Sequence, residues 1–220
     1  MRCPLRRPVY LAIEGVLGVG KTTLARLLAP LFRAQLLLEA FEENPFLSRF
    51  YADRARYAFQ TQIFFLLSRY RHQQEVRQAL QRGNLVSDYT FAKDRLFARL
   101  NLSGDELALY ESLYEALAEG LVLPDLIVYL RAETDTLMRR IAFRDRPYER
   151  NMDREYIERL RQAYESFFAT YTASPVIAID TDHLDFVQDP AHLTTIAGRI
   201  KSALGLGTHQ PTLPLEVKPP

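Results

Sequence analysis

The sequence predicts an α/β protein in which a five-stranded parallel sheet is covered by helices on both faces. Short apolar runs alternate with longer segments of helical periodicity, which is the pattern of parallel strands joined by helical crossovers. The apolar runs are continuous rather than alternating, as expected for strands buried on both sides. A glycine-rich loop, GVLGVGKTT, joins the first predicted strand to the first predicted helix.

The predicted elements follow one another in a regular order. The strands cover Val9–Ile13, Ala34–Leu38, Asn84–Asp88, Leu126–Leu130 and Val176–Asp180. The helical segments cover Thr22–Phe32, Arg56–Arg82, Ser103–Glu119, Thr134–Arg144 and Arg154–Thr172. Since no linker interrupts this order, we expect one domain over residues 1–204 and a Pro/Gly-rich tail over residues 205–220.

Two of these helices carry further local signals. Ser103 and Glu106 have the spacing of a capping box at a helix start. In the segment Arg56–Arg82, apolar side chains recur at helical spacing, and we expect most of this stripe to be core. The stripe consists of Phe59, Ile63, Leu66, Leu67 and Tyr70.

Composition and charge exclude several classes of partner. The 28 basic and 27 acidic side chains leave a net charge of +1. The overall electrostatic field of the protein therefore does not favour binding to nucleic acid or to an anionic membrane. No apolar run reaches the length of a transmembrane helix. The single cysteine, Cys3, excludes an intramolecular disulfide and a cysteine-based zinc site, and it fits a reducing cytoplasm.

The glycine-rich loop matches the pattern G-x-x-x-x-G-K-[ST]. Glycines let backbone N–H groups turn toward one anion, and the following helix adds the positive end of its dipole. In such a loop the lysine reaches the β- and γ-phosphates, and the hydroxyl of the next residue is a ligand for Mg²⁺. A strand before the loop and a helix after it argue against an incidental glycine turn. We therefore predict a nucleoside triphosphate site formed by Gly15, Gly18, Gly20, Lys21, Thr22 and Thr23.

Carboxylates stand at the ends of the second and third predicted strands, at Glu39 and Asp88. The carboxyl ends of strands hold ligands in open α/β sheets, so Glu39 could accept a proton from a hydroxyl nucleophile. Alternatively it is a helix-cap acid or a solvated acid, since Glu42 and Glu43 lie close by. Asp88 closes the third strand, where it could help to hold Mg²⁺ beside Thr22.

An arginine-rich segment lies downstream. Nine arginines and no lysine fall between Arg131 and Arg161. Arg140, Arg144 and Arg146 continue from a helix into a predicted loop, and guanidinium groups match phosphate oxygens. A solvated, salt-bridged face is the alternative, but the Pro- and Asp-containing break favours a mobile lid.

Together these motifs resemble the deoxyribonucleoside kinase family of deoxycytidine, deoxyadenosine and deoxyguanosine kinases, and its bacterial members in particular. The resemblance runs from Val9 to about Phe186 and rests on GVLGVGKTT, LLLEAFEENPFL, YAFQTQIFFLL, DYTFAKD and RRIAFRDRPYE, which occur in family order. It implies the three-layer P-loop kinase fold with an arginine-rich lid. The implied activity is phosphoryl transfer from ATP or another nucleoside triphosphate to the 5′-hydroxyl of a deoxyribonucleoside, and FEENPFL favours a purine.

The resemblance also implies roles for individual residues. Glu39 would be the general base, and Gln60 would pair with the nucleobase edge through its amide. Tyr51 and Glu149 would hold the sugar 3′-hydroxyl, and Asp94 would face the base, although it could equally be a helix N-terminal acid. The remaining matches are the lid arginines Arg140, Arg144 and Arg146, and Asp182 and Phe186 in the donor-base loop TDHLDF.

The chain departs from the family pattern at two positions. Tyr89 stands where relatives have an arginine that contacts the general base and the 5′-oxygen. Arg95 or another arginine could replace that group, or Tyr89 could donate a hydrogen bond instead. Leu67 stands where relatives have the arginine that pairs with the base-facing aspartate, and Arg69 is a candidate substitute.

Two other functions are also compatible with a phosphate loop. A nucleoside monophosphate kinase of the thymidylate kinase type would need a cationic site for the acceptor phosphate, whereas Glu39 suits a neutral hydroxyl. A GTP-dependent switch protein would need an N-K-x-D motif, which is missing, and D-x-x-G where D-Y-T-F stands. The family resemblance further implies a homodimer through helices around Lys93–Leu100 and Ser103–Glu119.

Overall fold

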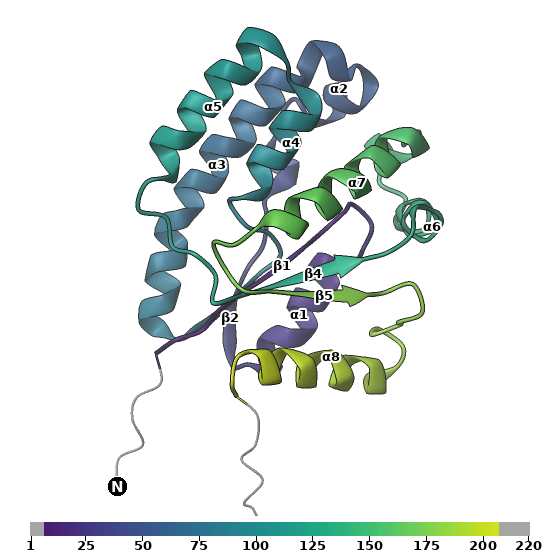
Figure 1. Cartoon of the computed structure of the whole chain (residues 1–220). Helices are drawn as coiled ribbons and strands as arrows, with labels where there is room; N and C mark the ends of the chain where they lie inside the picture. The colour runs from purple at the N-terminus through teal and green to yellow at the C-terminus, as the bar shows by residue number, and fades with distance from the viewer. Residues whose placement is uncertain (1–6, 207–220) are drawn as a thin grey trace, which may run out of the picture.

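A five-stranded sheet forms the centre of the molecule. The computed structural model describes residues 7–206. All strand pairs are parallel, and the strand order is β2-β3-β1-β4-β5 (Figure 1), which confirms the predicted fold class. The strands are β1 (Tyr10–Gly15), β2 (Ala34–Leu37), β3 (Asn84–Ser87), β4 (Leu126–Arg131) and β5 (Val176–Asp180).

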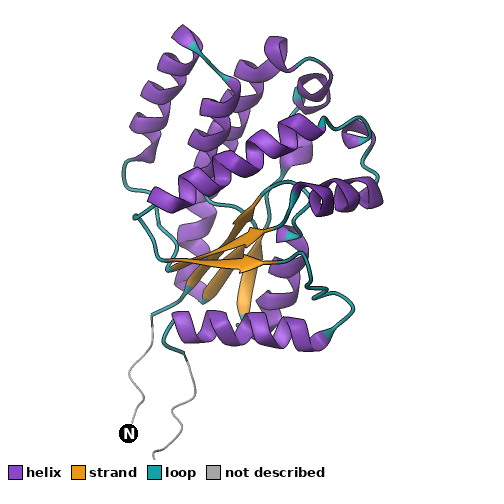
Figure 2. Ribbon diagram, turned by 45° about the vertical axis from the view of Figure 1, so that its right-hand side comes forward, coloured by secondary structure: helices purple, strands orange, loops and turns teal. Residues whose placement is uncertain are grey.

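Helices cover both faces of the sheet, giving three layers (Figures 1 and 2). The layer on one face consists of α1 (Lys21–Leu31) and α8 (Pro190–Ala203). The layer on the other face consists of α3 (Arg54–Arg82), α4 (Lys93–Asn101), α5 (Gly104–Ala118) and α7 (Arg154–Thr170). Two short helices and two 3-10 turns lie near the carboxyl ends of the strands: α2 (Leu47–Ala52), α6 (Thr134–Arg144), η1 (Phe41–Glu43) and η2 (Pro147–Glu149).

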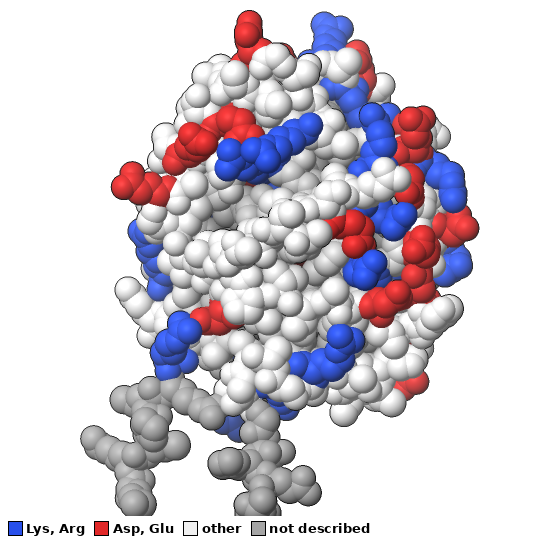
Figure 3. Space-filling model, in the orientation of Figure 1, with Lys and Arg blue, Asp and Glu red and all other residues white. Residues whose placement is uncertain are grey.

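The core follows from the continuous apolar runs. Leu11 and Ile13 on β1, and Val128 and Leu130 on β4, are at most 1% exposed, because helices pack on both faces of these central strands. Leu24 and other residues of α1 close the core on one side. Within residues 7–206, no helix combines the length and apolar character needed to span a bilayer. Figure 3 shows basic and acidic side chains interspersed over one face of the molecule.

Local predictions were less accurate than the strand assignments. The long helix α3 begins at Arg54, two residues before its predicted start. Ser103 is the N-cap residue of α5, but its side chain makes no capping hydrogen bond, so the predicted capping box is wrong. Leu66 is fully buried, whereas Leu67 and Tyr70 are 47% and 42% exposed, so these two do not belong to the core.

The strand order places three functional segments at one edge of the sheet. β3 lies between β1 and β2, so the segments that follow these three strands emerge side by side. They are the glycine-rich loop, the segment that begins with Leu38 and Glu39, and the turn that begins at Asp88. Ligands of open α/β sheets bind at such an edge.

Candidate active site

The glycine-rich loop connects β1 to α1. Gly20 is the N-cap residue of α1 and has a φ of 103°, in the left-handed region that favours glycine. A Cβ atom at Gly20 would lie 2.9 Å from Cζ of Phe186, so only glycine allows this close packing. The ammonium of Lys21 donates hydrogen bonds to the carbonyl oxygens of Gly15 at 2.8 Å and Val16 at 3.1 Å. The lysine is therefore held inside the loop by backbone acceptors.

Thr22 and Asp88 lie next to each other although they are far apart in the sequence. β1 pairs with β3 with Ala12 opposite Ser87, so the end of β3 lies beside the loop. Oγ1 of Thr22 donates to Oδ2 of Asp88 at 2.5 Å, and the backbone N–H of Glu39 donates to Oδ1 at 2.8 Å. The Asp88 carboxylate thus joins the phosphate loop to the segment that follows β2.

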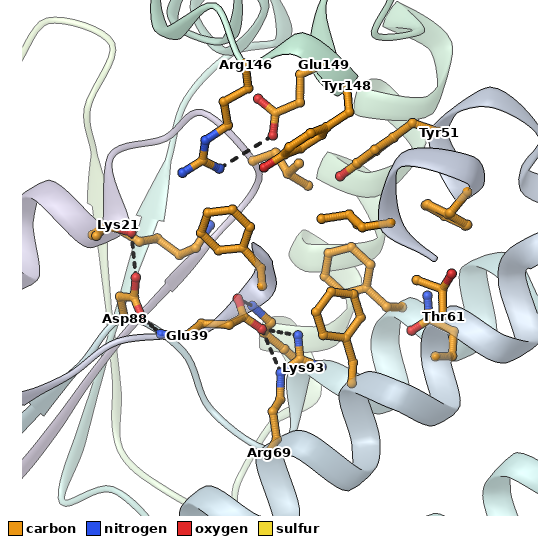
Figure 4. Close-up of a pocket in the computed structure, with 18 of the residues that line it drawn as sticks. Lys21, Glu39, Tyr51, Thr61, Arg69, Asp88, Lys93, Arg146, Tyr148 and Glu149 are labelled. Atoms are coloured by element: carbon orange, nitrogen blue, oxygen red, sulfur yellow. Dashed lines mark hydrogen bonds and ion pairs between the residues drawn. The ribbon is translucent and has the colours of Figure 1, made fainter. Parts of the chain in front are cut away.

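The Glu39 carboxylate is held by two cations from neighbouring helices (Figure 4). Nε of Arg69 donates to its Oε1 at 2.8 Å, and Nζ of Lys93 donates to its Oε2 at 2.6 Å. Burial favours the neutral acid, but Arg69 and Lys93 outweigh it and lower the pKa of Glu39 to about 2. Burial and the charge of Lys93 also lower the pKa of Lys21, to about 8. Glu39 is therefore a fixed negative charge at neutral pH.

Asp94 lies behind Arg69 rather than in the cavity. Its side chain is fully buried and pairs with Nη1 of Arg69. It is not among the residues that line the cavity beside Glu39, and its predicted contact with the nucleobase stays a prediction. Burial raises the pKa of Asp94 to about 7, against the attraction of Arg69. Asp94 positions the guanidinium that reaches the site.

A first cavity opens above Glu39 (Figure 4). The rings of Tyr51 and Tyr148 stack on its far side, with centroids 5.8 Å apart and planes at 9°. Glu149 is 3% exposed and lines the same cavity. Its carboxylate pairs with Arg144 and lies 3.6 Å from Nη1 of Arg146. Arg144 and Arg146 therefore pair with Glu149 rather than with the phosphate loop.

A second cavity lies over the phosphate loop, between α6 and residues 182–188. Asp182 and Phe186 line it, and their contact with a donor base stays a prediction. Arg140 also lines it, with Nη2 donating to the carbonyl oxygen of Thr181 at 2.7 Å and Nη1 donating to Oγ1 of the same residue at 3.0 Å. These contacts anchor Arg140 to the loop that borders the cavity.

The two cavities meet at four side chains. Both are lined by Lys21, Thr22, Arg144 and Arg146. Glu39 lines only the first cavity, whereas the glycines Gly18 and Gly20, together with Thr23, line only the second. A group in the second cavity can therefore reach a group in the first only across a point lined by three cations and one hydroxyl.

The predicted contact between Gln60 and a nucleobase has no support in the structure. Gln60 is exposed and lines neither cavity. Gln62 is 2% exposed and lines the first cavity, with its Oε1 buried and without a hydrogen-bond partner. Gln62 and Arg69 are seven residues apart, which places both on one face of α3. The sequence contains a seven-residue spacing both at Gln62 and Arg69 and, two residues earlier, at Gln60 and Leu67.

The two-residue offset between Gln60 and Gln62 also explains the apparent absence of an arginine at Leu67. Leu67 is exposed, and Arg69 occupies the site as the candidate substitute. The other substitution has a different outcome. Tyr89 is buried with its hydroxyl 3.0 Å from Nδ1 of His72, and Arg95 pairs with Glu111 on α5. Neither is a hydrogen-bond or ion-pair partner of Glu39, whose cations come from α3 and α4.

The fold and the site define a phosphotransferase built on a P-loop. A family model described as deoxynucleoside kinase matches residues 11–204. The chain belongs to this family and is a deoxynucleoside kinase.

Relatives with assigned activities cover most of the chain. A deoxyguanosine kinase of Bacillus subtilis is 34% identical over 201 residues, covering 89% of this chain and 97% of that protein. A deoxyadenosine kinase of Dictyostelium discoideum is 35% identical and covers 84% of this chain and 76% of its own length. The structure of deoxyadenosine kinase from M. mycoides with the products dCMP and dCDP has a TM-score of 0.76 at 26% identity, covering 88% of this chain and 100% of that one.

Proposed function

We propose that this kinase transfers the γ-phosphoryl group of ATP to the 5′-hydroxyl of a purine deoxyribonucleoside. The observation that carries the proposal is the meeting of the two cavities at Lys21, Thr22, Arg144 and Arg146. The nucleoside occupies the first cavity, beside Glu39, and the triphosphate occupies the second. Phosphoryl transfer then takes place where the cations converge.

Glu39 orients the nucleoside hydroxyl and receives its proton. A carboxylate with a pKa of about 2 is a weak base, so it acts mainly as a hydrogen-bond acceptor until the 5′-oxygen has begun to bond to phosphorus. A loose transition state for phosphoryl transfer allows this late proton transfer. As Arg69 and Lys93 already hold the carboxylate, its position is fixed before the substrate arrives.

Mg²⁺ and the triphosphate fit the residues at the end of β1. The Thr22 hydroxyl and the Asp88 carboxylate are hard oxygen donors, and their oxygens lie 2.5 Å apart, which suits a cation that keeps few protein ligands. Within residues 7–206 no group of three or more His, Cys, Asp or Glu side chains offers another site. Held by these two residues, the ion would supply positive charge that offsets the charge of the phosphates. Lys21 would contact the same phosphates.

The lid and the sugar site share Glu149. We place Tyr51 and Glu149 against the sugar 3′-hydroxyl, because both line the first cavity. Engagement of Glu149 by the sugar would release Arg144 and Arg146 toward the phosphates. Asp182 lines the second cavity, beside the place that we assign to the donor base.

Base selection is assigned to Gln62 rather than Gln60. The Gln62 amide can both donate and accept, and its buried Oε1 lacks a partner, so a purine edge would satisfy it. The relatives are named deoxyguanosine and deoxyadenosine kinases, with one deoxyadenosine/deoxycytidine kinase. These names support a purine deoxynucleoside as the main substrate.

We also propose a homodimer and a cytoplasmic location. Leu67 and Tyr70 on α3, and Leu109 and Leu113 on α5, are large apolar side chains left exposed on two helices that contact each other. A second copy of the chain would cover them. A single cysteine, Cys3, suits a reducing compartment.

A substrate panel tests the proposed reaction. The purified chain is incubated with ATP and Mg²⁺ and with each of the four deoxynucleosides or their 5′-monophosphates, and ADP and product are quantified. We expect monophosphates to form from deoxyadenosine and deoxyguanosine, and no turnover of the monophosphates. Lys21→Ala should abolish product, whereas Lys201→Ala, on the exposed face of α8, should not. Diphosphate formation from a monophosphate would instead identify a nucleoside monophosphate kinase.

A further inference from the structure

Lys93 is a buried cation at the acceptor side of the site. It is the first residue of α4, and its side chain is 7% exposed. Its ammonium lies 2.6 Å from Oε2 of Glu39, and it lines the same cavity as Lys21 and Thr22. A lysine is rarely buried to this degree without a partner that offsets its desolvation. Glu39 is that partner.

In the segment that precedes α4, the polar groups of Tyr89 and Thr90 point away from the cavity. Tyr89 points toward His72, and the N–H and Oγ1 of Thr90 donate to the buried carboxylate of Glu14 at 2.6 and 2.8 Å. Neither Tyr89 nor Thr90 lines the cavity. Among the described residues between β3 and the first turn of α4, the side chains that line the cavity are those of Asp88 and Lys93. They place a carboxylate and an ammonium on one wall.

The three cations near Glu39 differ in how firmly they are held. Arg69 bonds to both Glu39 and Asp94, which fixes the guanidinium from two sides. Lys21 donates to two loop carbonyls on the donor side. Lys93 has one carboxylate partner, and its ammonium is otherwise 6.0 and 5.9 Å from the ring centroids of Tyr89 and Phe97. Lys93 is therefore the cation that can most easily change partner.

We propose that Lys93 is a catalytic residue whose ammonium moves from Glu39 to the 5′-oxygen and the phosphoryl group in transfer. This inference rests on the proposed kinase reaction. The incoming 5′-hydroxyl donates a hydrogen bond to the Glu39 carboxylate and replaces the Lys93 ammonium as its partner. The bond from the 5′-oxygen to the γ-phosphorus forms as the bond from phosphorus to the bridging oxygen breaks. The hydroxyl proton goes to Glu39, ADP leaves with the electron pair, and Lys93 remains protonated.

A structural role for Lys93 predicts a different result. If the ammonium only neutralised Glu39, its loss would change stability and substrate binding together. A contact made in the transition state lowers kcat without a matching rise in KM. Removal of one such donor costs roughly a hundredfold to a thousandfold in kcat. The split between kcat and KM therefore separates the two roles.

The test compares Lys93→Met with Arg95→Met in the full chain. Arg95 lies two residues further along α4 and pairs with Glu111 and Glu115 on α5, outside both cavities. With the best nucleoside and saturating ATP, we expect kcat of Lys93→Met to fall by about a hundredfold or more while KM for the nucleoside stays within about threefold. Arg95→Met should keep kcat within about twofold. Thermal unfolding confirms that each variant is folded.

Replacement of the missing amine provides an independent readout. We expect ethylamine in the assay to restore part of kcat to Lys93→Ala and to leave Arg95→Met unchanged. A kcat of Lys93→Met within threefold of wild type would overturn the inference. A fall in kcat that is matched by an equal rise in the nucleoside KM, with no rescue by ethylamine, would also overturn it. If Lys93→Met does not fold, Lys93→Gln is judged by the same limits. Absence of turnover in the wild type would refute the kinase proposal itself.

Discussion

The hydroxyl of Thr22 donates to the carboxylate of Asp88 at 2.5 Å. This contact spans the glycine-rich loop and the end of β3, two segments separated by β2 and the long helix α3 in the sequence. The pairing of β3 with β1 brings them together. The same Asp88 accepts the backbone N–H of Glu39 at 2.8 Å. One carboxylate thus fixes the donor side of the site relative to the acceptor side.

Glu39→Gln should lower turnover by roughly a hundredfold to ten-thousandfold, the range for a positioned acid or base. The amide keeps the shape of the side chain but cannot take the hydroxyl proton. Steady-state kinetics measure the loss, and Glu42→Gln is the control because Glu42 is exposed. Turnover of Glu39→Gln within a few-fold of wild type would transfer the role of base to another carboxylate.

Gln62→Ala should raise KM for the nucleoside by about tenfold or more, because a buried base edge would lose its hydrogen bonds. Gln60→Ala is a matched control from the same helix, and its exposed side chain lines neither cavity. We expect unchanged kinetics for Gln60→Ala. The reverse pattern, with only Gln60→Ala impaired, would assign the nucleobase contact to Gln60 instead.

Arg144→Ala and Arg146→Ala should each lower kcat, by up to roughly a thousandfold if the guanidinium meets phosphates only in the closed lid. Nucleoside affinity should change much less. Lysine at either position should recover part of the loss, because an ammonium lacks the bidentate fork. Arg150→Ala is the control, since Arg150 pairs with exposed Asp145. Wild-type kcat in both alanine variants would mean that these arginines are surface residues without a role in phosphoryl transfer.

The free energy of unfolding should fall steeply above pH 10. Burial raises the pKa of Tyr10 and of Tyr156 to about 12, above the value near 10 of the unfolded chain. Their contribution is complete below pH 10 and is lost as pH rises toward 12, at about 1.4 kcal/mol per pH unit for each tyrosine. Denaturant unfolding between pH 9 and 11.5 measures the slope. Tyr156→Phe should make it shallower, and an unchanged slope would contradict the assignment.

The sheet, the phosphate loop and the family could be predicted from the amino-acid sequence alone. Each of these depends on residues that are contiguous or regularly spaced: five apolar runs, one glycine-rich loop and an arginine-rich segment after α6. The sequence predicts Glu39 and Asp88 at strand ends, and both line the first cavity. That prediction needed only the rule that parallel strands present their carboxyl ends at one edge.

The side chains of α3 and α4 that face the first cavity could not be predicted from the sequence. Gln60 and Gln62 differ by two residues, or about 200° around a helix, so a small shift in register exchanges an exposed side chain for one in the cavity. In the same way Lys93 reaches Glu39 while Arg95 faces α5. Within each pair, Gln60 with Gln62 and Lys93 with Arg95, the two residues have similar side chains and lie only two positions apart. The sequence therefore gives no reason to prefer one over the other as the residue in the cavity. The direction of each side chain was set by the packing of α3 and α4 beside the sheet, which depends on contacts between segments distant in the sequence.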